Sequence, residues 1–132
     1  MNTAVPRPAF APGSHAIAAY GRGAFAFAGM LHAGSILATP QGVRAIEAAS
    51  VDDLDASTLA PLIAECTERP GSVELLIVGT GARTVAIGQP LRDAIKRAGL
   101  RYEAMATGPA LRVYNVMQSE NRRVAAALIA AP

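Results

Sequence analysis

The feature of this sequence that most constrains its fold is a run of β-prone residues, Val73 to Val78, that ends in Gly79-Thr80-Gly81. The run reads Val-Glu-Leu-Leu-Ile-Val, and a near-continuous apolar segment of this length is typical of a strand buried on both faces. Such a strand requires cover on both sides of its sheet, and helices usually provide it. The run therefore predicts an interior strand of a helix-covered sheet.

Segments with helical periodicity precede and follow this strand in the sequence. Before it, four residues recur at helical spacing, namely Leu59, Leu62, Ile63 and Cys66. After it, helices are predicted over 90–98 and over 109–120, the latter with Thr107 as its cap. Strands are predicted over 101–106 and 124–130. Because strands and helices alternate, we expect right-handed crossovers and an α/β layer structure.

The segment from Gly23 to Val43 contains no Asp, Glu, Lys or Arg. Its glycines and Pro40 interrupt it too often for a transmembrane helix, so it is interpreted as a series of short strands. The turn Thr39–Gly42 predicts a hairpin that joins 35–38 with 43–47. These antiparallel strands either extend the main sheet or form a second one, and periodicity leaves both open.

A chain of 132 residues is long enough for one hydrophobic core, so a single α/β domain is expected over residues 15–132. Residues 1–14 contain three prolines and no strand or helix period, which predicts a flexible arm. The same region lacks the apolar run of a signal peptide, and the lone cysteine, interpreted as a core thiol, fits a reducing compartment. A cytoplasmic chain that does not span a membrane is therefore expected.

Composition argues against several classes of function. The 12 Lys and Arg are scattered and nearly balanced by 10 Asp and Glu, and the chain has three Phe, three Tyr and no Trp, so nucleic-acid binding is not expected. The spacing of Ser, Cys, His and acidic residues indicates no catalytic triad and no metal cluster, and a nucleotide-binding motif is missing. No catalytic residue, metal or cofactor is predicted.

One corner of the predicted sheet could still hold a ligand. If strands 73–78 and 101–106 are parallel neighbours, the loops that follow them emerge at one edge, where open α/β sheets bind ligands. Hydroxyls, backbone N–H groups and a guanidinium would meet there and could hold an anion. The residues of this hypothesis are Gly79, Thr80, Gly81, Arg83, Thr107 and Asn115. The alternatives are glycines that serve only a sharp turn, a solvated Arg83, and an Asn115 that makes a buried hydrogen bond to a neighbouring loop.

Several ordered motifs resemble one small family. They are Leu76-Ile77-Val78-Gly79-Thr80-Gly81, Thr107-Gly108-Pro109-Ala110, Tyr114-Asn115-Val116, Glu120-Asn121-Arg122-Arg123-Val124-Ala125-Ala126-Ala127-Leu128 and Gly34-Ser35-Ile36-Leu37-Ala38-Thr39-Pro40. The chain resembles, over residues 17–130, the family that includes the mitochondrial complex I assembly factor 3 and the adipogenesis-associated domain protein. The resemblance implies a three-layer α/β fold, in which helices flank a mixed central sheet and the N-terminal antiparallel strands add a β layer.

The resemblance also bears on function. It implies a non-catalytic interaction or assembly factor with a protein partner in membrane-complex assembly. Such a protein is expected to bind its partner, or to form a homo-oligomer, through an exposed apolar patch on the strand of Phe25 and Phe27. Family members often have a cysteine where this chain has Leu111, so thiol chemistry is not expected there. The alternative function is a small-molecule binding protein or enzyme that uses the corner described above.

Overall fold

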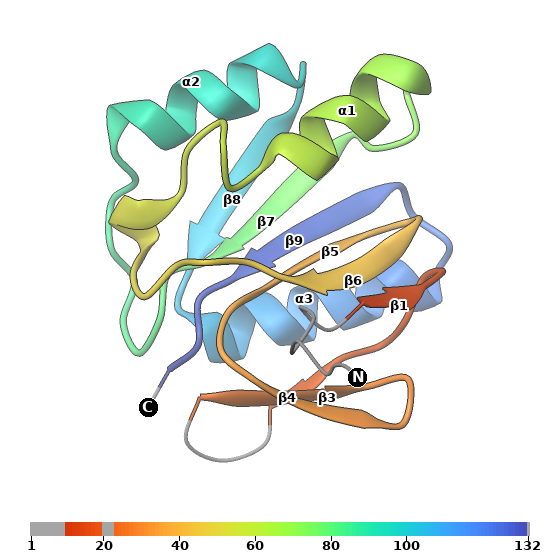
Figure 1. The fold of residues 1–132 in the computed structure, drawn as a ribbon, viewed down its shortest axis with the longest axis vertical. Coiled ribbons are helices and arrows are strands. Elements are labelled where there is room, and N and C mark those ends of the chain that lie inside the picture. The colour runs from red at the N-terminus through yellow and green to blue at the C-terminus, as the bar shows by residue number, and fades with distance from the viewer. Residues whose placement is uncertain (1–9, 20–22, 132) are drawn as a thin grey trace, which may run out of the picture.

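The computed structural model describes residues 10–19 and 23–131 and places two sheets and three α-helices in layers (Figure 1). The strands of the larger sheet are β1 (Phe10–Pro12), β5 (Ile36–Thr39), β6 (Gly42–Ala45), β7 (Leu75–Gly79), β8 (Arg101–Met105) and β9 (Val124–Leu128). Their order across the sheet is β1-β6-β5-β9-β7-β8. The smaller sheet consists of β2 (Ala18–Ala19), β3 (Ala24–Phe27) and β4 (Met30–Ala33), in that order. This arrangement confirms the expected mixed sheet with flanking helices and an added β layer.

The predicted interior strand, β7, lies between two parallel neighbours. Leu75 stands opposite Arg101 of β8 on one side and Val124 of β9 on the other. β9 in turn pairs antiparallel with β5, so the N-terminal hairpin of β5 and β6 extends the main sheet. A second sheet, the other arrangement that periodicity left open, is also present, because β2, β3 and β4 form a separate antiparallel sheet.

The start of the described chain differs from the flexible arm expected over residues 1–14. Phe10–Pro12 forms an edge strand that pairs antiparallel with β6, and Gly13 N–H donates to the carbonyl of Gln41 at 2.8 Å. The guanidinium carbon of Arg44 lies 4.7 Å from the ring centre of Phe10, which adds a cation–π contact across these strands. Three residues are too few to show a period, so pairing along the free edge of β6 decides their structure. Residues 1–9 lie outside the described residues.

The helices cover both faces of the main sheet (Figure 1). α1 (Ala60–Glu68) and α2 (Gln89–Arg97) lie on one face, and α3 (Thr107–Ser119) lies on the other, together with the smaller sheet. α2 ends at Arg97, and Gly99 lies just beyond its end as predicted, with a φ of +73° that glycine readily adopts. The predicted cap of α3 is wrong. The N-cap is Ala106, which makes no side-chain hydrogen bond, and Thr107 is the first residue of the helix. The hydroxyl of Thr107 donates instead to the carbonyl of Ile129.

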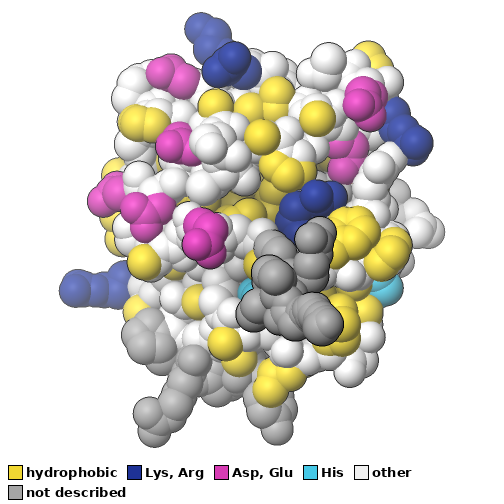
Figure 2. All heavy atoms as spheres, viewed as in Figure 1, with side chains coloured by type: hydrophobic (Ala, Val, Ile, Leu, Met, Phe, Trp, Pro, Cys, Tyr) yellow, Lys and Arg dark blue, Asp and Glu magenta, His cyan; other side chains and the backbone are white. Residues whose placement is uncertain are grey.

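Side chains alternate between two apolar clusters, one on each face of the main sheet. Leu76 and Val78 point toward α1 and α2, while Ile77 packs with Tyr114 of α3. Phe25 and Phe27 are 2% and 3% exposed, so they belong to the core beside α3 and cannot form the expected surface patch. Figure 2 shows acidic side chains over the short helix η1 (Val51–Asp53) and a mixture of acidic and basic side chains over α1 and α2. Below them, over β3 and β4, the described atoms are hydrophobic or uncharged.

Candidate functional site

The two loops of the predicted ligand corner do meet. Gly81 N–H donates to Thr107 Oγ1 at 2.9 Å, and Thr107 N–H donates to the carbonyl of Gly81 at 2.8 Å. The Thr107 hydroxyl donates in turn to the carbonyl of Ile129 at 2.7 Å. A Cβ on Gly79 would lie 2.9 Å from Thr107 Oγ1, so only glycine lets the two loops approach this closely. Thr107 therefore joins three segments of chain.

The second hydroxyl of the corner is also engaged within the protein. Thr80 Oγ1 contacts the carbonyl oxygens of Arg83 and Met105 and accepts the N–H of Val85. Thr80 and Thr107 are both buried, at 6% and 3% exposure. Arg83, in contrast, has an exposed side chain. Because the two hydroxyls and the Gly81 N–H already have protein partners, an anion there would have to displace internal bonds, and the anion site stays a prediction.

Asn115 lies on α3 and serves a different part of the fold. Its Oδ1 accepts the N–H of Ile17 at 2.8 Å, and its Nδ2 donates to the carbonyl of the same residue at 2.6 Å. The oxygen and the nitrogen of the side-chain amide thus both bond to the backbone of Ile17. This agrees with the alternative interpretation of Asn115, in which its amide makes a buried hydrogen bond to a neighbouring segment. The side chain explains why an asparagine occurs in the middle of a helix, where its propensity is poor.

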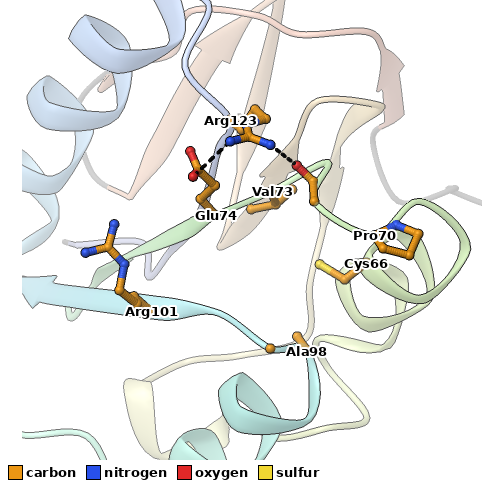
Figure 3. A pocket seen from close by; sticks show the side chains of 9 residues that line it. Cys66, Pro70, Val73, Glu74, Ala98, Arg101 and Arg123 are labelled. Carbon is orange, nitrogen blue, oxygen red and sulfur yellow. Dashed lines mark hydrogen bonds and ion pairs between the residues drawn. The ribbon is translucent and has the colours of Figure 1, made fainter.

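The structure has a cleft that the sequence did not indicate, at the opposite end of β7 from the predicted corner. It has a volume of about 490 Å³ and lies where the C-terminal ends of α1 and α2 face the beginnings of β7 and β8. Figure 3 shows Cys66, Glu74, Arg101 and Arg123 around it. Arg123 is fixed by a bond to the Gly71 carbonyl at 2.8 Å and by Glu74 at 2.9 Å.

The cleft carries charges of both signs. Arg123 is paired with Glu74, Arg101 adds a second positive charge, and the C-terminal ends of α1 and α2 present the negative poles of their dipoles. Burial raises the pKa of the Cys66 thiol, and the nearby Glu65 raises it further. A raised pKa leaves less of this thiol in the nucleophilic thiolate form.

The outer side of α3 presents a second surface feature. Val113, Val116 and Met117, with Arg112, line a shallow hollow of about 290 Å³, and Val116 is 57% exposed. Arg112 is the single charged residue between Thr107 and Ser119. A helix that covers a sheet on one side normally carries polar residues on the other, so the exposed Val116 departs from the usual pattern on the outer side of α3.

Within 10–19 and 23–131, no three His, Cys, Asp or Glu side chains come together in a group that could hold a metal ion. In the same part of the chain, no helix combines the length and the apolar character needed to cross a membrane.

Comparison with known proteins identifies the relatives of this chain. Residues 17–129 match the family described as "Protein of unknown function (DUF498/DUF598)". The chain belongs to this family. An uncharacterised protein of Rhodobacter capsulatus is 36% identical over 125 residues, which cover 95% of this chain and 91% of that protein. The NADH dehydrogenase [ubiquinone] 1 alpha subcomplex assembly factor 3 of Danio rerio is 38% identical over 60 residues, 46% of this chain and 34% of the relative.

Solved structures from other bacteria share the architecture. An outer membrane protein from Bartonella henselae superimposes with a TM-score of 0.77 at 34% identity, covering 92% of this chain and 98% of that chain. A Bordetella pertussis protein with a Mth938-like domain gives a TM-score of 0.72 at 27% identity, covering 88% and 85%. The family resemblance drawn from the motifs is therefore confirmed, and the fold belongs to this family.

The packing of Val113 and Met117 against the core is predicted from the sequence and confirmed, whereas the exposure of the neighbouring Val116 is not predicted. Val113 and Met117 share helical spacing with the buried Ala110 and Tyr114, so they are interpreted as one packed face. The available signal was the width of the apolar stripe, which continues to Val116 and is broken by one arginine. The cleft gave no signal, because its residues come from four segments that only the topology brings together.

Proposed function

We propose that this DUF498/DUF598 member is a non-catalytic protein-binding factor that acts in the assembly of a respiratory membrane complex. The observation that carries the proposal is the outer side of α3, where the exposed Val116 and the partly buried Val113 and Met117 line a hollow. Exposed apolar surface on a folded domain costs solvation free energy and is commonly found where another protein binds.

The chemistry of this surface defines the partner. An apolar side chain would fill the hollow over Val116, and the guanidinium of Arg112 at its margin would pair with a carboxylate. The partner is therefore a protein that presents a hydrophobic side chain next to an acidic one. Burying Val116 in such a contact contributes about 1 to 2 kcal/mol, a factor of about ten in affinity.

The other features of the described chain support binding over catalysis. The hydroxyls of Thr80 and Thr107 hold loops together, and the Cys66 thiol has a raised pKa. The process in the proposal comes from the Danio rerio relative, since its name is that of an assembly factor for NADH dehydrogenase. That match covers 34% of the relative, and the role of the relative supports the proposal.

The test is complementation of a deletion strain. Cells that lack the chain should accumulate less assembled NADH dehydrogenase on native gels, and the unaltered chain should restore it. The Val116→Glu variant should fail to restore it, because a carboxylate at this position opposes apolar contact and repels the acidic partner group. Arg92→Glu is the matched control, an exposed change on α2, and should restore assembly fully.

Two results would overturn this function. One is a deletion strain with unchanged amounts and activity of all respiratory complexes. The other is a Val116→Glu chain that is folded, as judged by its circular dichroism, and that restores assembly as well as the unaltered chain does.

A further inference from the structure

The edge strand β4 exposes backbone groups that no described segment uses. The turn between β3 and β4 has positive φ at Ala28 (51°) and Gly29 (75°), which is the conformation of a two-residue type I′ hairpin. In such a hairpin the flanking pair, here Phe27 and Met30, exchanges both hydrogen bonds. Pairs then alternate along the ladder, and the bond from Gly34 N–H to the Gly23 carbonyl at 2.9 Å fits this alternation.

The alternation fixes which groups of β4 point outward. Met30 and His32 bond to β3, so the N–H and C=O groups of Leu31 and Ala33 point away from it, along the free edge. In the sheet order β2-β3-β4, no described strand pairs with that edge. Leu31 is also 61% exposed, which makes it the most exposed of the large hydrophobic residues described.

The free edge of β4 differs from the other strand edges in this fold. β8 carries Arg101 and Glu103, β1 ends in Pro12, and β2 has only two residues. Charges, proline and short length are the common means by which proteins prevent edge strands from pairing. β4 has none of these features, and the segment from Gly23 to Val43 around it lacks charged residues altogether.

We propose that β4 pairs antiparallel with β4 of a second copy of this chain, about a twofold axis at His32. In this register Leu31 faces Ala33 of the second copy, and the same pair repeats on the other side of the axis. The four outward N–H and C=O groups of each copy then find partners, which gives four hydrogen bonds between the copies. Leu31 packs beside the small Ala33 of the second copy, His32 stands opposite His32 at the axis, and the strand contributes no Asp, Glu, Lys or Arg to the contact.

A second copy fits this edge better than an unrelated segment. The outward residues Leu31 and Ala33 lie symmetrically about His32, so the edge is complementary to itself without any change of register. The face that Leu31 and Ala33 share also carries Ala24 and Ala26 of β3, so the joined sheet of two copies has an uncharged face. This interface is separate from the outer side of α3, and the proposed assembly function does not depend on it.

The test measures mass and backbone protection on the whole chain. Sedimentation equilibrium should show the mass rising with concentration from 13.6 kDa toward twice that value. Over the same range, hydrogen exchange at the Leu31 amide should slow. Ala33→Pro removes an outward N–H and leaves the β3 pairing intact, so this variant should stay at the monomer mass while circular dichroism shows it folded. Arg101→Ala, on the β8 edge, is the matched control and should dimerise as before.

Three results would overturn the pairing. The first is a monomer mass at all concentrations. The second is a dimer that Ala33→Pro leaves unchanged, which would place the contact on another surface. The third is a Leu31 amide that is protected to the same degree at every concentration, which would mean that another part of the same chain covers the edge.

Discussion

The side chain of Asn115 on α3 holds both backbone polar groups of Ile17, a residue 98 positions earlier in the chain. Its amide accepts the Ile17 N–H at 2.8 Å and donates to the Ile17 carbonyl at 2.6 Å, in the manner of a neighbouring strand. Ile17 is 2% exposed and lies just before β2. This contact therefore ties the smaller sheet to the helix that covers the main one.

The first prediction concerns this contact. Asn115→Ala should lower the free energy of unfolding by about 2 to 3 kcal/mol, because it leaves a buried N–H and a buried carbonyl without partners. Urea denaturation followed by circular dichroism measures the change. Ser119→Ala, which removes an exposed hydroxyl bond on the same helix, should cost less than about 0.5 kcal/mol. Equal losses in the two variants would contradict this role of Asn115.

The second prediction concerns the loop junction at Thr107. Thr107→Val preserves the shape of the side chain but removes the hydroxyl that bonds Gly81 and Ile129, so it should destabilise the fold by about 2 to 3 kcal/mol. Thr107→Ser keeps the hydroxyl and should cost about 1 kcal/mol, the effect of one lost methyl group. Thermal unfolding of both variants at one pH compares them. If the serine variant proved the less stable of the two, the hydroxyl would not be the joining group.

The third prediction is a loss of stability in alkali that depends on Tyr114. Burial raises the pKa of its phenol from the ordinary 10.0 to about 12. The folded state thus binds this proton more tightly than the unfolded state does. The resulting contribution to the free energy of unfolding is complete below pH 10 and is lost as the pH rises to about 12. The loss should amount to about 2 to 3 kcal/mol.

Tyr114→Phe tests this pH dependence, because phenylalanine cannot ionise. Unfolding free energies measured between pH 9 and about 12 should fall less steeply in this variant than in the unaltered chain. Tyr102→Phe, which alters a tyrosine that is 39% exposed, should leave the slope unchanged. Identical slopes in the unaltered chain and in Tyr114→Phe would contradict the prediction.

The fourth prediction concerns a buried carboxyl group. Glu65 is 7% exposed, and its Oε1 accepts the hydroxyl of Thr39 at 2.6 Å, while Oε2 has no hydrogen-bond partner among the described residues. Glu65→Gln keeps the acceptor for Thr39 and removes a charge from the interior, so it should stabilise the fold by about 1 kcal/mol. Chemical denaturation at neutral pH measures it, with the exposed Glu68→Gln as control. A clear loss of stability would show that the charge is paired in solution.

The sequence predicts the C-terminal part of this fold well, because its elements have strong periods. The buried run before Gly79 and the apolar segment after Arg123 indicate strands, and their parallel pairing follows from the helices between them. The N-terminal part is less predictable. Phe10–Pro12 and Ala18–Ala19 are too short to show a period, and they become strands only because an edge is available to them.

The candidate site illustrates a further limit. Sequence alone places Thr107 next to the Gly79–Gly81 loop, and the structure confirms that they meet. Sequence does not show which way a hydroxyl points, and here the Thr107 hydroxyl binds backbone groups within the protein. Likewise, the spacing that predicts a packed face for Val113 and Met117 does not show how far around the helix the packing extends.

The most direct test of the assembly function is photocrosslinking from the outer side of α3 in living cells. A photoreactive amino acid at Val116 should crosslink to a defined subunit of a respiratory complex, and the same amino acid at the exposed Arg92 on α2 should not. The crosslink should also disappear when Arg112 is changed to Glu, since the proposed partner has a carboxylate beside this residue. A position 116 probe that captures no protein beyond what the position 92 probe captures would contradict the account.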